Sequence, residues 1–535
     1  MTNPLLTMDS LPPFSQIQPD QVQPAVTQAI ADCKQKIEDV LAQKEPHTWD
    51  SLIAPLEEVN DRLSRIWSPI SHLNAVQNSE ALRAAHDACL PLLSEFQTYV
   101  GQHEGLYQAY LALSESDDFP RLDDAQRKEI LNTLRDFRLS GIGLPAEAQQ
   151  RYGEIQARLS ELASRFSNNV LDATQGWHKL VTDEAELAGL PASAQAAARQ
   201  MAELKGKEGW LFTLDIPSYL PVMMYADSRA LRAELYEAFT TRASDQGPNA
   251  GKWDNSAIMT ELLTLRRELA RLLGFANYAE LSLATKMADK PEQVVDFLTD
   301  LAAKSLPQGK AELEEIRAFA AEQHGQDELA AWDLAYYAEK LKQHKFSVSD
   351  EQLRPYFPAG RVVKGLFEVV KRVFGMKVRE RLGIDTWHPD VRFYDIFDAD
   401  DELRGSFYLD LYAREHKQGG AWMDVCLGRR YRQDGSLQKP VAYLTCNFNG
   451  PVDGKPALFT HNEVVTLFHE FGHGIHHMLT RIDVAGVAGI NGVAWDAVEL
   501  PSQFLENWCW ESEALAFISG HHETGEPLPA DLLEK

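Results

Sequence analysis

The sequence predicts a mainly α-helical protein with one small antiparallel β-sheet, placed directly before an unusually well-marked helix. Two observations predict this class. Apolar residues recur at spacings of three and four over most of residues 20–300, as they do on the buried faces of helices. After about residue 390 the pattern changes to short segments rich in Phe, Tyr, Val, Leu and Thr, separated by Gly and Asp, which is typical of strands joined by turns.

Length and composition limit the organisation and the partners. A chain of 535 residues exceeds one ordinary core, so we divide it into an N-terminal helical region, residues 1–224, and a second region, residues 225–535. The formal charge of −27 repels phosphate backbones and anionic lipids, and predicts neither nucleic acid nor membrane as a partner. Five scattered cysteines without a Cys-x-x-Cys pair indicate a reducing compartment. We expect a cytoplasmic monomer.

Two stripes illustrate the helical pattern, and both are interpreted as core faces without chemistry. They consist of Val26, Ile30, Cys33, Ile37 and Val40, and of Val294, Phe297, Leu298 and Leu301. A short β interruption is predicted near residues 210–225, where Pro217 and Pro221 flank aromatic and β-branched residues. Three antiparallel strands are predicted at 403–415, 420–432 and 440–449.

The helix that follows these strands is predicted over about residues 461–480, and its start is marked by two independent signals. Thr460 and Glu463 have the spacing of a capping box. Phe459 and Val464 have the spacing of a hydrophobic staple across that cap. The first turn of this helix is therefore fixed by the local sequence.

This helix contains the pattern His-Glu-x-x-His. His469 and His473 lie one turn apart and about 40° apart around the axis, so both imidazoles can reach one zinc ion. Glu470 points beside the metal, where a general base acts on water. Gly472 permits close packing, and the opposite face is apolar: Val464, Phe468, Phe471, Ile475 and Leu479. The alternative is a buried helix with two hydrogen-bonded histidines, which the motif alone leaves open.

Two residues compete to be the third ligand. His476 shares the face of His469 but lies two turns away, so we place it beside the site rather than on the ion. Glu499 is the better candidate, because a second helix over about residues 496–512 would bring it to the histidine pair and leave one zinc position open. On that helix Asp496 and Glu506 are candidates to orient the ligands, with an ordinary solvated acidic face as the alternative. The Gly-rich segment 484–493 is either a mobile loop at the site or a plain connector.

At this point the sequence resembles the thimet-oligopeptidase family of zinc metallopeptidases. The resemblance rests on residues 468–473 and 499–508, and on three upstream segments, 214–223, 407–415 and 440–448. It extends over essentially the whole chain. It implies a two-lobed helical fold around a deep channel, with one zinc ion on the channel floor.

The resemblance also implies the chemistry and the residues that perform it. His469, His473 and Glu499 would bind zinc, and Glu470 would be the catalytic base. The substrates would be short unfolded peptides, cytoplasmic and signal-derived, cleaved by a metalloendopeptidase. Residues 528–535 read as the opening of a helix, whereas family members continue further, so we expect a C-terminally truncated catalytic region.

Two other functions compete with this one. A truncated product could bind peptide or zinc with impaired catalysis. A structural zinc site would require four protein ligands, and the sequence near the motif offers no evident fourth.

Overall fold

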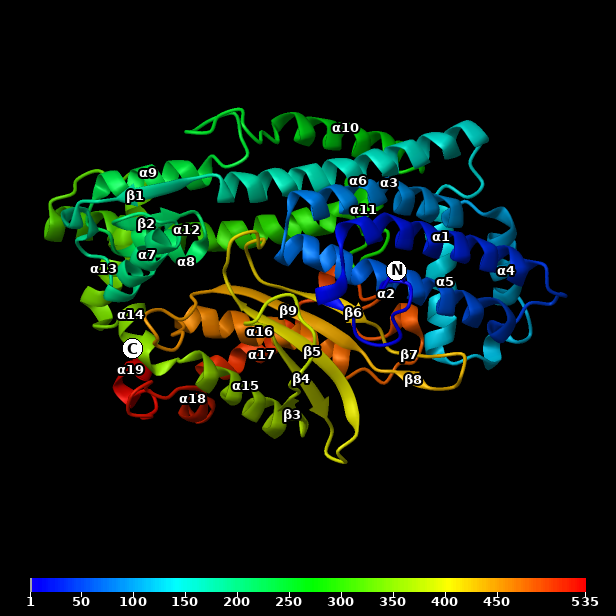
Figure 1. The fold of residues 1–535 in the computed structure, drawn as a ribbon. Coiled ribbons are helices and arrows are strands. Elements are labelled where there is room, and N and C mark those ends of the chain that lie inside the picture. Colours follow the sequence, from blue (N-terminus) through cyan, green and yellow to red (C-terminus); the bar gives the residue numbers. More distant parts are fainter. Residues whose placement is uncertain (1) are drawn as a thin grey trace.

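The computed structural model describes residues 2–535 and is mainly helical, with a small sheet beside the histidine-bearing helix, as the sequence predicts (Figure 1). Five helices form the N-terminal part: α1 (Pro19–Leu41), α2 (Ala54–Val76), α3 (Glu80–Gly101), α4 (Glu104–Ser114) and α5 (Asp124–Leu139). The stripe predicted on α1 is buried throughout, from Val26 to Val40. Short 3-10 or π turns join many of the helices.

The middle of the chain is a series of helices interrupted by one two-stranded ribbon. The helices are α6 (Ala146–Gln175), α7 (Ala192–Leu204), α8 (Ile216–Tyr225), α9 (Arg229–Thr240), α10 (Ser256–Leu272), α11 (Tyr278–Leu283), α12 (Pro291–His324), α13 (Leu334–Phe346), α14 (Asp350–Leu353) and α15 (Ala359–Phe374). The ribbon pairs β1 (His178–Val181) with β2 (Trp210–Thr213). The predicted β interruption is thus right for residues 210–213 and wrong for 216–225, where Pro217 begins α8 because proline suits the first turn of a helix.

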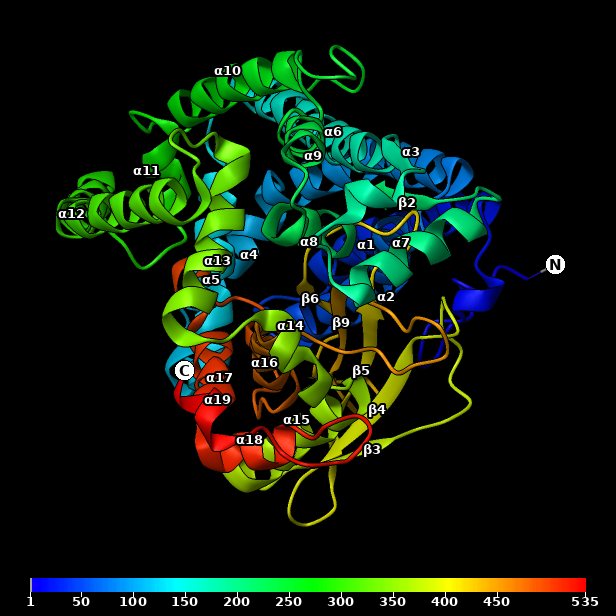
Figure 2. The same cartoon turned by 90° about the vertical axis from the view of Figure 1, so that its left-hand side faces the viewer.

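The prediction that the second apolar stripe, on α12, is a core face is wrong. Phe297, Leu298 and Leu301 on α12 are 66%, 54% and 51% exposed, so they do not form a core face in residues 2–535. On this helix only Phe319 and Ala320, near its C-terminal end, are buried. Figure 2 shows α12 at the outer side of the molecule, beyond α11 and α13.

The main sheet has five strands in the order β3-β4-β5-β9-β6. They are β3 (Lys377–Glu380), β4 (Arg392–Phe397), β5 (Leu403–Tyr412), β6 (Trp422–Leu427) and β9 (Val441–Phe448), and a separate pair joins β7 (Arg430–Tyr431) to β8 (Leu437–Gln438). The prediction of three antiparallel strands is wrong in one respect, because β5 and β9 are parallel. The chain forms β6 after β5 and before β9. In the sheet β9 lies between β5 and β6, which leaves β6 at the edge.

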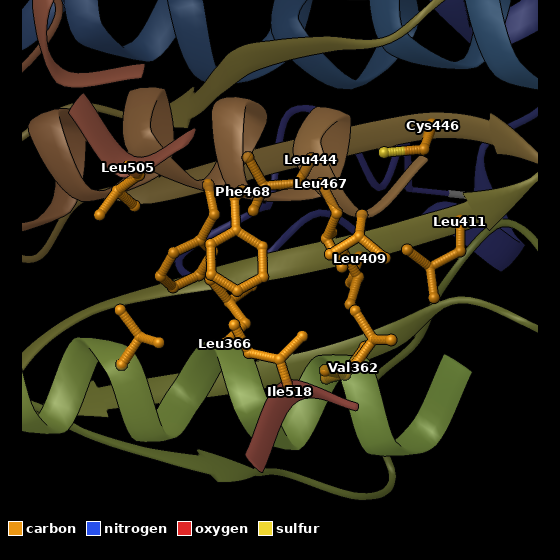
Figure 3. Close-up of a cluster of buried hydrophobic side chains, with 14 of the residues drawn as sticks. Val362, Leu366, Leu409, Leu411, Leu444, Cys446, Leu467, Phe468, Leu505 and Ile518 are labelled. Carbon is orange, nitrogen blue, oxygen red and sulfur yellow. The ribbon is translucent and has the colours of Figure 1, made fainter. Parts of the chain in front are cut away.

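The sheet is covered on both faces. On one face Leu409 and Leu444 pack against α15 and against α16 (His461–Met478), as the close-up of this core shows (Figure 3). On the other face Tyr408 and Tyr443 join a core shared with α1, α2 and α3. Burial on both faces explains why the central strands read as continuous apolar runs.

Three short helices follow α16: α17 (Leu500–Glu506), α18 (Ser512–Ile518) and α19 (Ala530–Glu534). The single helix predicted over 496–512 is therefore wrong. Residues 495–497 and 507–510 are 3-10 turns, and Pro501 occupies the first turn of α17. The boundary proposed near residue 224 falls in the last turn of α8 and stays a prediction. No helix within residues 2–535 is both long and apolar enough to cross a membrane.

Candidate metal centre

The histidine-bearing helix α16 begins as its sequence predicts. The Thr460 side chain accepts a hydrogen bond from the backbone N–H of Glu463, and the Glu463 carboxylate accepts one from the N–H of Thr460. Phe459 and Val464 are both fully buried in the same core, as a hydrophobic staple requires. Because this start is fixed, the positions of the histidines along the helix are fixed as well.

The second half of the site reaches α16 at its glycine. A Cβ atom on Gly472 would lie 2.6 Å from the carbonyl oxygen of Pro501 and 2.6 Å from the Cα of Ser502. Only a residue without a side chain allows this approach. Gly472 thereby brings the start of α17, and the preceding Glu499, next to the two histidines.

Three side chains converge at this contact. His469 Nε2 lies 3.0 Å and His473 Nε2 lies 3.2 Å from the same oxygen, Oε2 of Glu499. Two ligand atoms on a tetrahedral zinc ion, each about 2.0–2.1 Å from the metal, are separated by roughly 3.3 Å. The nitrogen–oxygen spacings are close to that value, so the donor set fits a zinc ion without rearrangement of the backbone.

A second carboxylate orients one of these rings. Glu506 Oε2 lies 3.1 Å from His469 Nδ1. A neutral His469 ring that donates from Nδ1 to this carboxylate has the lone pair of Nε2 facing Glu499, which is the tautomer that a metal ligand requires. Glu499 is held as well, because the Ser502 hydroxyl donates to its Oε2 at 2.6 Å. Burial alone would raise the pKa of Glu499, but the Ser502 hydrogen bond, together with the two imidazoles when they are protonated, outweighs burial and lowers the pKa.

Glu470 lies next to His469 in the chain and is buried, 6% exposed. Burial raises the pKa of its carboxyl group to about 7, with His469 opposing the shift and Glu499 adding to it. A carboxyl group that changes protonation near neutral pH can accept a proton and return it.

The structure does not bring every candidate residue to the site. Both carboxylate oxygens of Asp496 accept hydrogen bonds from the backbone N–H groups of Met287 and Ala288, so these contacts give no support to the prediction that Asp496 orients a ligand. The helix that would have turned it inward is a 3-10 turn at that point. His476 is half-buried near His473, and burial lowers its pKa.

The Gly-rich segment 484–493 packs against the N-terminal helices. The N–H of Ala485 donates to Glu57 on α2, and a Cβ on Gly486 would collide with the carboxylate of Glu129 on α5. Ser502 was missed by sequence analysis as a partner of Glu499. The sequence signal for this partner was the position of Ser502, three residues after Glu499. At that spacing a hydroxyl group in the first turn of a helix can reach the residue three positions earlier.

The fold and the candidate site are those expected of a mainly helical metallopeptidase, and the comparisons with known proteins show the class and the family. The signature of Peptidase family M3 matches residues 222–535, and that of the Neurolysin/Thimet oligopeptidase N-terminal domain matches residues 26–149. The chain belongs to peptidase family M3, whose members are in general zinc metallopeptidases.

The chain is similar to curated and solved proteins over nearly its full length. It is 68% identical to "Oligopeptidase A" of Escherichia coli, over 100% of the chain and 79% of that protein. It is 30% identical to "Dipeptidyl carboxypeptidase" of the same species, over 100% of the chain and 78% of that protein. The crystal structure of a putative oligoendopeptidase F from Bacillus anthracis has a TM-score of 0.54 and 16% identity, covers 92% of the chain and 71% of that structure, and supports the fold alone.

Proposed function

We propose that His469, His473 and Glu499 hold one zinc ion and that Glu470 is the general base of a metalloendopeptidase that hydrolyses short peptides. The observation that supports this most directly is the convergence of both Nε2 atoms on one carboxylate oxygen, at 3.0 and 3.2 Å. The three ligand atoms lie within 4.8 Å of one another. The Glu499 side chain is 50% exposed, which leaves an approach for a substrate.

Each residue has a separate task in this proposal. When bound, zinc supplies a Lewis acid that polarises a peptide carbonyl and makes a nearby water more acidic. Glu506 keeps the His469 ring in the orientation and tautomer that a ligand needs. Glu470 takes a proton from the attacking water and gives it to the leaving nitrogen of the cleaved peptide bond.

The substrate proposed here is a short, unfolded peptide in the cytoplasm. The relatives named above are an oligopeptidase and a dipeptidyl carboxypeptidase, which supports a peptide substrate. The sheet offers an edge strand, β6, that contacts α16. An extended peptide would add to that edge through main-chain hydrogen bonds, which bind peptides of varied sequence.

The test of the base is the substitution Glu470→Gln. It removes the proton acceptor but keeps the shape of the side chain, so turnover of a quenched fluorescent peptide should fall about a hundredfold or more. Zinc content, measured by metal analysis of the purified chain, should not change. Glu513→Gln, the same substitution at an exposed site on α18, is the matched control and should leave turnover unaffected.

Removal of the metal distinguishes this function from its alternatives. A chelator should abolish hydrolysis, and added zinc should restore it. Near-normal hydrolysis by the Glu470→Gln chain would refute the assigned base. Zinc binding without any hydrolysis by the unaltered chain would instead favour the peptide- or zinc-binding product.

A further inference from the structure

Three sequence segments that the zinc chemistry does not use meet around one cavity. These are 214–223, 407–415 and 440–448, which carry much of the family resemblance. A cavity of about 380 Å³ is lined by Leu214, Asp215, Ile216 and Pro217 from the first segment, by Ala413 from the second and by Asn447 from the third. Helix α6 and the residues Phe239 and Arg242 at the end of α9 complete its wall. The volume suits a few residues of a peptide and excludes a folded domain.

Two opposite charges in this wall, Asp215 and Arg242, form no direct ion pair with any residue of 2–535, although each charge acts on the other through space. Within residues 2–535 the Asp215 carboxylate accepts two long hydrogen bonds, from Thr213 Oγ1 at 3.3 Å and from Gln175 Nε2 at 3.5 Å. Burial raises the pKa of its carboxyl group. The charge of Arg242 opposes this rise without reversing it, so a ligand cation in direct contact would add to the compensation of Asp215.

The guanidinium group of Arg242 is in the same situation. It lies over the ring of Phe239 and donates to the Phe239 carbonyl at 2.9 Å and to the Thr174 hydroxyl at 2.8 Å. Burial lowers its pKa, with Tyr219 and Asp215 opposing the shift, and among residues 2–535 no carboxylate lies within ion-pair distance of its guanidinium group. A guanidinium has five N–H donors, so some remain for oxygen atoms of a ligand.

The remaining cation at the cavity is already used. Lys417 is fully buried and donates to Asp410 Oδ1 at 2.9 Å and to the Tyr412 carbonyl at 2.7 Å. This network fixes the segment between β5 and β6, whose Gly419 and Gly420 also line the cavity. Because Lys417 makes these contacts, it forms no ion pair with Asp215.

The cavity adjoins a second cavity and lies beside the start of the edge strand β6. It shares Phe166 and Ser167 on α6 with a larger cavity of about 1060 Å³, between α3, α6 and α10. On its other side Gly420 is followed by Trp422, the first residue of the edge strand β6, which contacts α16. A peptide lying along β6 would thus extend from the histidine helix towards Asp215.

We propose that this cavity is a second peptide-binding subsite, in which Asp215 binds a cationic group of the substrate and Arg242 binds a main-chain oxygen. The cationic group is the free amino terminus or a basic side chain, since both present N–H donors and a positive charge. This inference rests on the proposed peptidase function, because it assigns the substrate a remote contact. It makes Asp215 a determinant of specificity.

The experiment measures binding, so it does not depend on cleavage. The zinc-loaded Glu470→Gln chain is titrated into three short fluorescently labelled peptides of the same neutral sequence, and anisotropy gives the affinity. One peptide has a free amino terminus, the second is acetylated, and the third is acetylated but carries one lysine. Asp215→Asn in this background should weaken binding of a cationic peptide about tenfold and leave the acetylated neutral peptide unchanged.

Two further variants test the role of Arg242 and control for a change of net charge outside the cavity. Arg242→Gln should weaken the binding of all three peptides, since each peptide presents main-chain oxygens. Glu208→Gln, exposed and two residues before β2, removes one negative charge outside the cavity and should change nothing. Circular dichroism and thermal midpoints verify that each variant is folded.

The outcomes separate the two proposals. A loss confined to the free-amine peptide assigns Asp215 to the amino terminus, and a loss confined to the lysine peptide assigns it to a basic side chain. The subsite would be overturned if Asp215→Asn weakened binding of all three peptides equally or of none. It would also be overturned if the parent chain bound no peptide, or if Glu208→Gln had the same effect as Asp215→Asn. Absence of chelator-sensitive hydrolysis by the unaltered chain, with Asp215-dependent binding intact, would refute only the peptidase function.

Discussion

The helices α16 and α12 both carry large apolar residues at helical spacing, but their surroundings differ. On α16, Val464 and Phe468 are fully buried between the sheet, α15 and α17. On α12, Phe297 and Leu298 are more than half exposed. The same periodicity is thus a core face in one helix and an open surface in the other. What decides is whether another element of residues 2–535 packs against the stripe.

The polar contacts of the two helices differ in the same way. The histidine side of α16 is held by Glu499 and Glu506, which come from a separate segment. The main charged contact of α12 to its neighbour α13 is Glu315 with Lys345, and both side chains are nearly half exposed. Exposed pairs of this kind contribute about 0–1 kcal/mol. The position of α16 is therefore determined by packing, and that of α12 much less so.

The largest expected difference follows from a pair of matched truncations. Phe468→Ala should lower the free energy of unfolding by about 3–5 kcal/mol, because it leaves a cavity in a fully packed core. Phe297→Ala should change it by no more than about 0.5 kcal/mol, as expected for an exposed site. Urea denaturation monitored by circular dichroism measures both. Equal losses would mean that the α12 stripe is covered in solution.

A second pair compares glycines within the two helices. Gly472→Ala on α16 places a methyl group 2.6 Å from backbone atoms of Pro501 and Ser502, which cannot rotate away. We expect a loss of about 1–3 kcal/mol and weaker zinc binding, since Glu499 moves with α17. Gly309→Ala on α12 meets no atom within 4 Å and should stabilise the chain by about 0.5–1 kcal/mol. A stabilised Gly472→Ala chain would contradict the close contact.

The smallest effect concerns a carboxyl group buried beside the segment that follows α16. Burial raises the pKa of Glu57 from 4.5 to about 7, the charge on Glu129 adds to it, and the Ala485 N–H opposes it. The folded state therefore retains a proton that the unfolded state has lost, so stability falls as the pH rises from 4.5 to about 7.

The substitution Glu57→Gln removes this pH-dependent loss of stability, because glutamine carries no titratable proton. The variant's free energy of unfolding should exceed that of the unaltered chain by on the order of 1 kcal/mol above pH 7 and by nothing below pH 4.5. Thermal midpoints across this range measure the difference. Glu315→Gln on α12 is the control, and a gain of the same size and pH dependence there would argue against burial as the cause.

The comparison also shows what could be read from the sequence. The start and the apolar face of α16 were predicted correctly because the signals are local: a capping box, a hydrophobic staple and apolar residues at intervals of three and four. The neighbourhood of Glu499 and the histidines was predicted because motif spacing and family resemblance agree. The features of the helix start depend on residues within one or two turns of each other, whereas the contact of Glu499 with the histidines joins two separate segments.

The features that were not predicted depend on distant partners. Strand periodicity is the same for parallel and antiparallel neighbours, so the pairing of β5 with β9 could not be read from either strand. The turn at residues 495–497 is stabilised by the contact of Asp496 with Met287 and Ala288, some 200 residues earlier. The exposure of α12 is likewise a property of its surroundings rather than of its own residues.

The core that joins the sheet to α1, α2 and α3 has a consequence for the order of synthesis. Phe96 on α3 and Tyr408 on β5 belong to one cluster, although roughly 300 residues separate them. At about 5–20 residues per second, the ribosome needs roughly 15–60 s to deliver the strands after the helices. During that interval the apolar faces of α1, α2 and α3 that later pack against the sheet stay exposed, and the nascent chain is then most prone to aggregation.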